Sequence, residues 1–256
     1  MDKQSLKARF DLALQVAKET AGYLLSHESL RSEITAKGDN DYVTSADKAA
    51  ERLIIGRIKE NFPGDAVLGE ETGGAHSGTR WIIDPIDGTV DFMTSFPNYT
   101  VSIAFEDETG LAFGVIICPR QNELFSAMRG EGAYLNGRRI ATDETLPMSE
   151  SLAILVPPHR FKQHLDEYMK TMHDFYYVVS DVRSMGSAAL SLCYVAAGRV
   201  ACYYEMALHI YDVAAGVVIV REAGGKVTFL TGGEDWINIA ASSSASHEKV
   251  LEVING

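Results

Sequence analysis

The chain has 256 residues, 46% of them apolar and 23% charged, which is the composition of a globular protein with a substantial core. Its formal net charge of −12 argues against a nucleic-acid partner, because binding to a phosphate backbone usually needs a basic stripe. The three cysteines show no CxxC spacing, no apolar run approaches the length of a membrane span, and no signal peptide is recognised, so we expect a soluble protein of the reducing cytoplasm without disulfides or a zinc knuckle.

The first part of the chain is predicted to form two amphipathic helices. Apolar residues recur at intervals of three and four over 5–27 and again over 47–61. The polar, glycine-containing segment 36–42 between them is typical of an exposed loop. Thr44 and Asp47 have the spacing of a capping box at the start of the second helix, and capping alone would explain Asp47.

A short apolar run over 66–69 ends on two adjacent carboxylates, Glu70 and Glu71. On a strand these two side chains would point to opposite faces, so that one glutamate can face a site while the other faces elsewhere. A solvated pair of glutamates at the end of a strand is the alternative. The glycine-containing segment 73–78 is then expected to be a flexible link.

The stretch from Trp81 to Thr89 brings several candidate ligand-binding residues together within a few positions. An apolar run leads into Asp84 and Asp87, which are close enough for both carboxylates to face one point beyond the end of a strand. Oxygen ligands suit a hard divalent cation such as Mg²⁺. Gly88 lets the backbone approach a ligand, and N–H groups of Gly88 and Thr89 at a helix start would bind an anion. The alternative is an Asp-Pro turn followed by an Asp-Gly turn.

The segments that follow predict two sheets within a single domain. Consecutive strands favour an antiparallel sheet in an N-terminal half, residues 1–145. Strands that alternate with helices favour a second, layered sheet in a C-terminal half, residues 146–256. The expected strands lie at 99–105, 111–117, 123–128, 133–135, 152–156, 175–180, 200–204, 226–230 and 237–241, and the expected helices at 159–172, 186–197 and 212–223, with a short helix at the end of the chain.

Two acidic residues of the C-terminal half are further candidates for the site. Asp212 stands where a helix should begin, and an N-cap role would explain it alone. Glu205 lies next to a strand end seven residues earlier, where a solvated glutamate would also be ordinary.

No Gly-x-Ser-x-Gly motif marks a serine nucleophile, and the seven histidines are scattered without zinc-motif spacing. Taken one at a time, the acidic residues leave a structural and a chemical interpretation open.

Three segments taken together, Gly69–Glu71, Asp84–Thr89 and Tyr211–Gly216, resemble the signature motifs of the inositol monophosphatase family, with matching order and spacing over nearly the whole chain. The resemblance implies a layered α-β-α-β-α sandwich of the α/β (α+β) class, with an antiparallel sheet in the first half and a mixed sheet in the second. It also implies a magnesium-dependent phosphatase of a lithium-sensitive superfamily, which usually forms homodimers.

The resemblance further implies a role for each residue of the site. Two to three Mg²⁺ ions would bind, the third and weakest through Glu70, on the side covered by the mobile loop around Lys37. The implied metal ligands are Glu70, Asp84, the carbonyl of Ile86, Asp87 and Asp212, and the implied catalytic residues are Asp47, Thr89 and Glu70. Asp47 and Thr89 would position the attacking water and help to deprotonate it, which capping by Asp47 does not exclude. Phosphoryl transfer mainly needs positioning and charge neutralisation, which metal ions supply.

The preferred substrate depends on Glu205, which occupies the place of a glutamate that binds ring hydroxyls in inositol-specific members. The implied substrate contacts are Asp87, Gly88, Thr89, Ser187, Ala188 and Glu205. We therefore expect hydrolysis of inositol 1-phosphate, with some breadth towards other polyol and sugar phosphates. The chain departs from the family pattern at Tyr211, where tryptophan is usual, and at Val90 and Asp91.

Two alternatives remain open at this stage. One is a related phosphatase that acts on fructose 1,6-bisphosphate, histidinol phosphate or a 3′-phosphonucleotide. The other is a regulatory interaction protein, because some bacterial relatives are described as partners of the transcription machinery.

Overall fold

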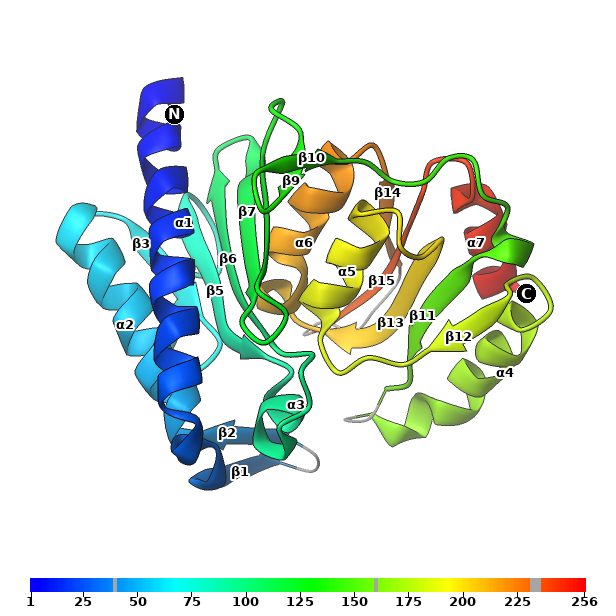
Figure 1. The fold of residues 1–256 in the computed structure, drawn as a ribbon, viewed down its shortest axis with the longest axis horizontal. Coiled ribbons are helices and arrows are strands. Elements are labelled where there is room, and N and C mark those ends of the chain that lie inside the picture. The colour runs from blue at the N-terminus through cyan, green and yellow to red at the C-terminus, as the bar shows by residue number, and fades with distance from the viewer. Residues whose placement is uncertain (39–40, 159–160, 231–235) are drawn as a thin grey trace.

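The protein folds as alternating layers of helices and sheets, seen edge-on in Figure 1. The computed structural model describes residues 1–38, 41–158, 161–230 and 236–256. One sheet is covered on its outer face by α1 (Lys3–Ser26) and α2 (Ser45–Asn61), and α5 (Ala188–Ala196) and α6 (Ile210–Glu222) lie between the two sheets. Helices α4 (Leu165–Phe175) and α7 (His247–Asn255) cover the outer face of the second sheet. The expected α-β-α-β-α sandwich is thereby confirmed.

The first sheet has eight strands in the order β10-β9-β8-β7-β6-β5-β3-β4 within the described chain. All neighbouring pairs are antiparallel except β3 and β5, which run parallel. The prediction of an antiparallel sheet is therefore wrong at this one pair, because the chain returns from β3 to β5 by a crossover rather than a hairpin. The strands are β3 (Ala66–Gly69), β4 (Gly73–Gly74), β5 (Arg80–Asp87), β6 (Thr100–Asp107), β7 (Gly110–Cys118), β8 (Glu123–Met128), β9 (Ala133–Leu135) and β10 (Arg138–Ile140).

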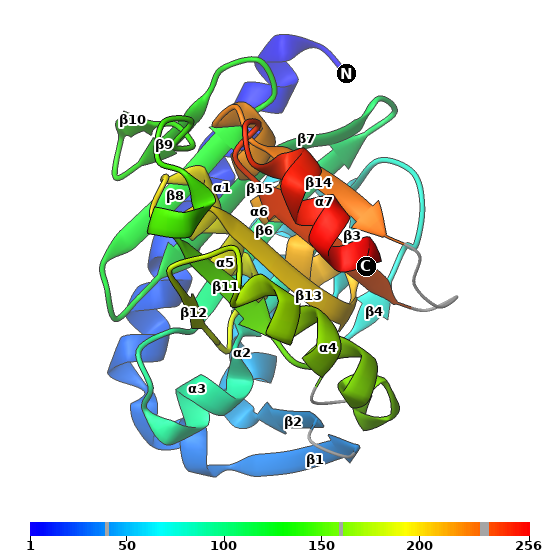
Figure 2. The same ribbon diagram turned by 90° about the vertical axis from the view of Figure 1, so that its right-hand side faces the viewer.

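The second sheet has five strands in the order β12-β11-β13-β15-β14 within the described chain. Strand β11 pairs in parallel with β12 and β13, while β15 pairs antiparallel with β13 and β14, so the expected mixed sheet is confirmed. Figure 2 shows α4 and α7 lying across its outer face. The strands are β11 (Leu152–Val156), β12 (Asp181–Arg183), β13 (Cys202–Leu208), β14 (Lys226–Leu230) and β15 (Ile237–Ser242).

Local sequence signals explain how the first two helices begin. The Asp2 carboxylate caps α1 by accepting the N–H of Ser5 at 2.9 Å. Thr44 and Asp47 form a complete capping box at the start of α2, as their spacing predicts. The short helix α3 (Thr89–Thr94) begins directly after Gly88, whose φ of +94° few other residues adopt without strain.

Helix α6 is buried all along residues 212–220 because it packs between the two sheets. Gly114 of β7 allows the close approach: a Cβ atom there would lie 2.2 Å from the carbonyl oxygen of Ala215. The helix therefore rests directly on the first sheet, in contact with β5, β6 and β7. Its first turn, which contains Asp212, is consequently held near the end of β5.

The structure corrects two further local predictions. Of the segment 36–42, expected to be an exposed loop, residues 36–38 and 41–42 belong to the antiparallel pair β1 (Ile34–Gly38) and β2 (Asp41–Thr44), and residues 39 and 40 lie outside the described residues. The strand expected at 175–180 is instead the end of α4 and a turn, and β12 follows it. Residues 159 and 160, the expected start of the preceding helix, lie outside the described residues, and α4 itself begins at Leu165 after the 3₁₀ turn Lys162–His164.

Two other 3₁₀ turns connect these elements, Glu28–Ser32 after α1 and Met148–Glu150 before β11. No helix within the described ranges is both long and apolar enough to cross a membrane.

Candidate metal centre

Asp84 and Asp87 come to one side of the first sheet because the end of β5 is irregular. Asp84 pairs with Ser102 of β6 and Asp87 with Thr100, so three steps along β5 match two along β6. Three steps along a regular strand would place the two carboxylates on opposite faces, and the bulge cancels that reversal. The Asp84 carboxylate stabilises the bulge by accepting the N–H of Ile86 at 3.0 Å.

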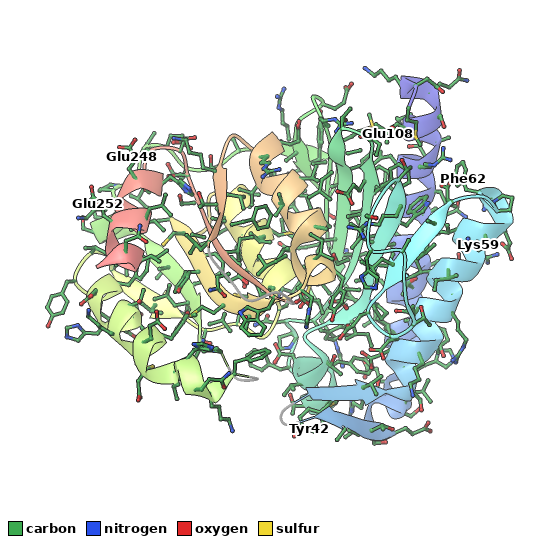
Figure 3. All side chains as sticks on the ribbon, turned by 180° about the vertical axis from the view of Figure 1, so that it is seen from behind. Tyr42, Lys59, Phe62, Glu108, Glu248 and Glu252 are labelled. Carbon is green, nitrogen blue, oxygen red and sulfur yellow. The ribbon has the colours of Figure 1, made fainter. Side chains whose placement is uncertain are left out.

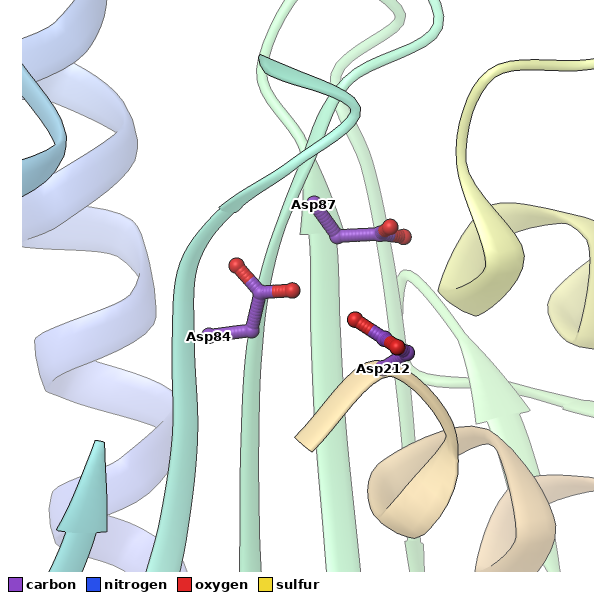
Figure 4. A group of neighbouring side chains, drawn as sticks. All are labelled: Asp84, Asp87 and Asp212. Carbon is purple, nitrogen blue, oxygen red and sulfur yellow. The ribbon is translucent and has the colours of Figure 1, made fainter. Parts of the chain in front are cut away.

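Asp212 reaches the same point from the C-terminal half of the chain (Figure 4). It lies in the first turn of α6, and its carboxylate accepts the backbone N–H of His209 at 2.6 Å. The N-cap itself is His209, so Asp212 does not hold the N-cap position considered from the sequence; as the third residue of the helix it accepts the N–H of the N-cap residue. Each of Asp84, Asp87 and Asp212 nevertheless offers one carboxylate oxygen within 4.8 Å of the others, and all three side chains are buried.

The three carboxylates lie close enough to repel one another, and burial removes them from most of their contact with solvent. Burial raises the pKa of Asp84 well above its usual 3.8, and the charges of Glu70, Asp87 and Asp212 raise it further. Burial likewise raises the pKa of Asp87 to about 6, although its hydrogen bonds lower it. A bound cation would relieve this repulsion. The carboxylate oxygens are hard donors that suit a divalent cation such as Mg²⁺, and they lie close enough together to bind the same ion.

Glu70 belongs to the same cavity as the three aspartates. It follows the last residue of β3, and the parallel pairing with β5 brings this strand end beside Asp84. The Glu70 N–H donates to the carbonyl of Ile83 at 3.2 Å, and the Glu70 side chain is close enough to Asp84 for its charge to raise the pKa of that carboxyl. Ile86 also lines the cavity. The carbonyl assigned to it as a metal ligand accepts the Thr89 hydroxyl at 3.2 Å.

Asp47 and Thr89 meet although 42 residues separate them in sequence. The Thr89 hydroxyl lies 3.4 Å from Oδ1 of Asp47, while Oδ2 of Asp47 takes the capping bonds from Thr44. One oxygen of this carboxylate is therefore used in capping and the other faces Thr89, although Asp47 itself is completely buried and is not among the residues that line the cavity. Burial raises the pKa of Asp47 to about 6, where a carboxylate can accept a proton near neutral pH.

The start of α5 holds Asp87 in place. The Ser187 hydroxyl donates to Oδ2 of Asp87 at 2.5 Å, and the N–H groups of Ala189 and Ala188 donate to the same carboxylate at 2.8 and 3.3 Å. Ser187 is completely buried and does not line the cavity. In this structure the Ser187 hydroxyl orients Asp87, and its expected contact with substrate stays a prediction. Ala188 does line the cavity.

The cavity has a volume of about 640 Å³, and its wall contains the acidic cluster together with apolar and polar side chains. Gly88 and Thr89 line it at the start of α3, as expected from the sequence. Glu205 lines it from β13, buried, with Oε2 accepting the Tyr203 hydroxyl at 2.5 Å. The solvated role considered for Glu205 is therefore excluded.

Several wall residues lie outside the sequence motifs. Asp91 was singled out only as a departure from the family pattern; here its carboxylate packs against Gly186, where a Cβ atom would approach it to 2.5 Å. The others come from separate elements and share no periodicity or spacing that could have identified them. They are Tyr42 at the hairpin (labelled in Figure 3), Phe96, Val156, Pro157, Lys162, Met185 and Leu208. The side chain of Lys37 lies outside the described residues.

The chain is similar in sequence and in fold to known proteins. A model of the inositol monophosphatase family matches residues 3–255. The chain is 37% identical over 252 residues to the Nus factor SuhB of Vibrio cholerae, covering 95% of this chain and 94% of that protein. The extragenic suppressor protein suhB of Bartonella henselae has a similar structure, with a TM-score of 0.90, 34% identity and coverage of 96% and 98%. An IMPase of Thermotoga maritima aligns with a TM-score of 0.88 and 31% identity over 97% of each chain.

The first prediction concerns stability without metal. Because Asp47 and Asp87 hold protons more tightly in the folded protein than their usual pKa of 3.8 implies, the folded state binds more protons than the unfolded chain. Their contribution to the free energy of unfolding therefore falls as pH rises from about 4 through about 6. Asp84 belongs to the same cluster, and its charge repels that of Asp87. Replacing it by the neutral amide removes this repulsion. In chelator, Asp84→Asn should therefore be more stable than the wild type by about 1–2 kcal/mol at pH 7.5, or roughly 2–8 °C in Tm, and the difference should shrink towards pH 5.

Thermal unfolding with chelator and with Mg²⁺ checks this prediction. Mg²⁺ should raise the Tm of the wild type and leave that of Asp84→Asn almost unchanged. An Asp84→Asn variant that is less stable than the wild type in chelator, or equally stabilised by Mg²⁺, would contradict the metal-centre assignment.

Proposed function

The chain belongs to the inositol monophosphatase family, and from this premise we propose that it is a magnesium-dependent phosphatase with inositol 1-phosphate as its preferred substrate. One observation carries the proposal: the same cavity is lined by a cluster of buried carboxylates and by a further buried carboxylate, Glu205, from β13. The first feature suits a phosphate held through metal ions, and the second suits a leaving group that carries hydroxyls. Some breadth towards other polyol and sugar phosphates is part of the proposal.

The acidic cluster supplies the ligands for the metal ions. We assign one Mg²⁺ to Glu70, Asp84 and the Ile86 carbonyl, and a second to Asp84, Asp87 and Asp212, with a weaker third beside Glu70. Bound Mg²⁺ would neutralise the phosphate charge and make a coordinated water more acidic. Hydrogen bonds from Ser187 and the α5 backbone keep Asp87 oriented before any ion arrives.

Thr89 and Asp47 are the residues placed to handle the proton of the attacking water. We assign Thr89 to orient the water through its hydroxyl, and Asp47 to accept the proton through the oxygen that lies 3.4 Å from that hydroxyl. The capping bonds from Thr44 hold the Asp47 carboxylate in this orientation. The N–H groups of Gly88 and Thr89 would bind phosphate oxygens where they line the cavity. No side chain of the protein needs to act as the nucleophile.

The charges along the wall favour a polyol over a substrate with a second phosphate. Among the described lining residues Lys162 is the only lysine or arginine, whereas Asp91 and Glu205 add carboxylates to the cavity wall beyond the acidic cluster. A bisphosphate or 3′-phosphonucleotide would place further negative charge there. Hydroxyl groups can instead donate hydrogen bonds to Glu205, which Tyr203 holds in position. This supports inositol 1-phosphate over fructose 1,6-bisphosphate and the 3′-phosphonucleotides.

Substrate choice is tested by Glu205→Gln. A hydrogen bond to a charged group contributes roughly 1.5–3 kcal/mol, so kcat/KM for inositol 1-phosphate should fall by about 10- to 100-fold. The same variant should lose less than about threefold on p-nitrophenyl phosphate, whose leaving group has no hydroxyl to bind. Equal losses on both substrates, or a wild type that prefers fructose 1,6-bisphosphate or histidinol phosphate, would refute the assignment of Glu205.

The proton-accepting role is tested by Asp47→Asn. The amide keeps the size of the side chain but accepts no proton, so kcat should fall by about 10²- to 10⁴-fold. Mg²⁺ should still raise the Tm of this variant, because Asp47 is not an assigned metal ligand. The decisive observation against the role would be a kcat within threefold of the wild type at saturating Mg²⁺.

A regulatory role is the second candidate function, and the name of curated relatives favours it: the Vibrio cholerae protein is called a Nus factor. We propose that this chain could serve the same role separately from hydrolysis. In a host whose own gene of this kind is deleted, Asp87→Asn should then restore growth as well as the wild type while releasing no phosphate. Failure of Asp87→Asn to restore growth, at equal protein levels, would tie the cellular role to hydrolysis. We also propose that the protein is cytoplasmic and forms a homodimer.

A further inference from the structure

Glu51 is a completely buried carboxylate that the proposed mechanism does not use. It lies on α2, four residues after Asp47, so the two side chains share one face of the helix. That face points towards the end of β3, where Glu70 stands. Buried carboxylates are rare unless they are paired, so the position of Glu51 requires an explanation.

The contacts of Glu51 lie on both sides of Glu70. After Glu70, the backbone N–H of Glu71 donates to Oε2 of Glu51 at 2.9 Å. Before Glu70, Gly69 packs directly on the same carboxylate: a Cβ atom at Gly69 would lie 2.6 Å from Oε2 and 2.9 Å from Oε1. Glycine at this position therefore leaves the space that the Glu51 carboxylate fills.

The backbone at Glu70 is consequently held from two directions. On the β5 side, the Glu70 N–H donates to the carbonyl of Ile83. On the α2 side, the Glu51 carboxylate fills the space over Gly69 and accepts the next N–H. A short strand end that carries a metal ligand would otherwise be free to shift, and small shifts of a ligand weaken metal binding.

The hydrogen bonding of Glu51 argues against a role in stability alone. Its Oε1 has no hydrogen-bond partner among the described residues, although it is buried. An unsatisfied buried polar atom costs about 1–3 kcal/mol, so a well-packed apolar side chain would serve a purely structural role better. The feature that an apolar side chain could not provide is the acceptor for the Glu71 N–H.

We propose that Glu51 is a positioning residue that fixes Glu70 by bracing the backbone on both sides of it, and thereby sets how tightly the centre binds Mg²⁺. The inference rests on the proposed metal-binding role of Glu70. It assigns no contact between Glu51 and the substrate or the metal.

Calorimetric titration of the folded, metal-free protein with Mg²⁺ tests the proposal directly. Glu51→Ala removes the brace, and loss of a residue that orients a ligand typically weakens metal binding by about 10- to 100-fold. Gly69→Ala should weaken it similarly, because the new methyl group displaces the carboxylate. Glu51→Gln keeps an acceptor of the same length and should restore the dissociation constant to within about threefold of the wild type.

A matched control separates positioning from general loosening of α2. Glu19→Ala removes the partner of Arg57, an ion pair of 2.6 Å that joins α1 to α2 away from the site, and should leave the Mg²⁺ dissociation constant unchanged. Should Glu51→Ala fail to fold, Gly69→Ala and Glu51→Gln decide the matter. Wild-type affinity in Glu51→Ala or in Gly69→Ala would overturn the proposal for Glu51 alone, whereas a wild type that binds no Mg²⁺ would overturn the proposed function itself.

Discussion

The electrostatic cost of placing several carboxylates together out of water is the constraint on which the rest of the structure depends. Asp84, Asp87 and Asp212 are buried within contact of one another, and burial and mutual repulsion raise the pKa of Asp84 well above its usual value. A fold optimised only for stability would not retain such a group. The scaffold tolerates it because β5, α5 and α6 supply backbone N–H groups and a rigid, apolar surrounding that keep each carboxylate oriented.

The residues that shape the chain locally are also those that would perform the chemistry. Asp47 completes the capping box of α2 with one oxygen and faces Thr89 with the other, and Asp212, in the first turn of α6, accepts the N–H of the N-cap residue His209 while joining the acidic cluster. The structural and the chemical interpretations of these residues therefore do not compete. A helix start is a suitable place for such a double role, because its free N–H groups orient a carboxylate without occupying both of its oxygens.

Sequence reasoning anticipated the layered fold and the meeting of Asp84, Asp87 and Asp212, because motif order and local periodicity carry that information. It misjudged features that depend on distant parts of the chain. Residues 36–38 and 41–42 look like parts of a loop but belong to β1 and β2, since the pairing of these strands overrides their polar composition. The strand expected at 175–180 is displaced to β12 because α4 continues to Phe175. Ser187 carries no local sign that its hydroxyl turns inward to Asp87, and Lys162 reaches the cavity wall only through tertiary packing.

The central claim is that this cluster binds Mg²⁺ for phosphate ester hydrolysis. The most direct measurement is release of inorganic phosphate from inositol 1-phosphate by the wild-type protein, first with Mg²⁺, then with chelator, and again after Mg²⁺ is restored. The account predicts release that stops in chelator and returns in full with the metal. Release that continues unchanged in chelator, or no release from inositol 1-phosphate or any other phosphate monoester with Mg²⁺ present, would contradict it.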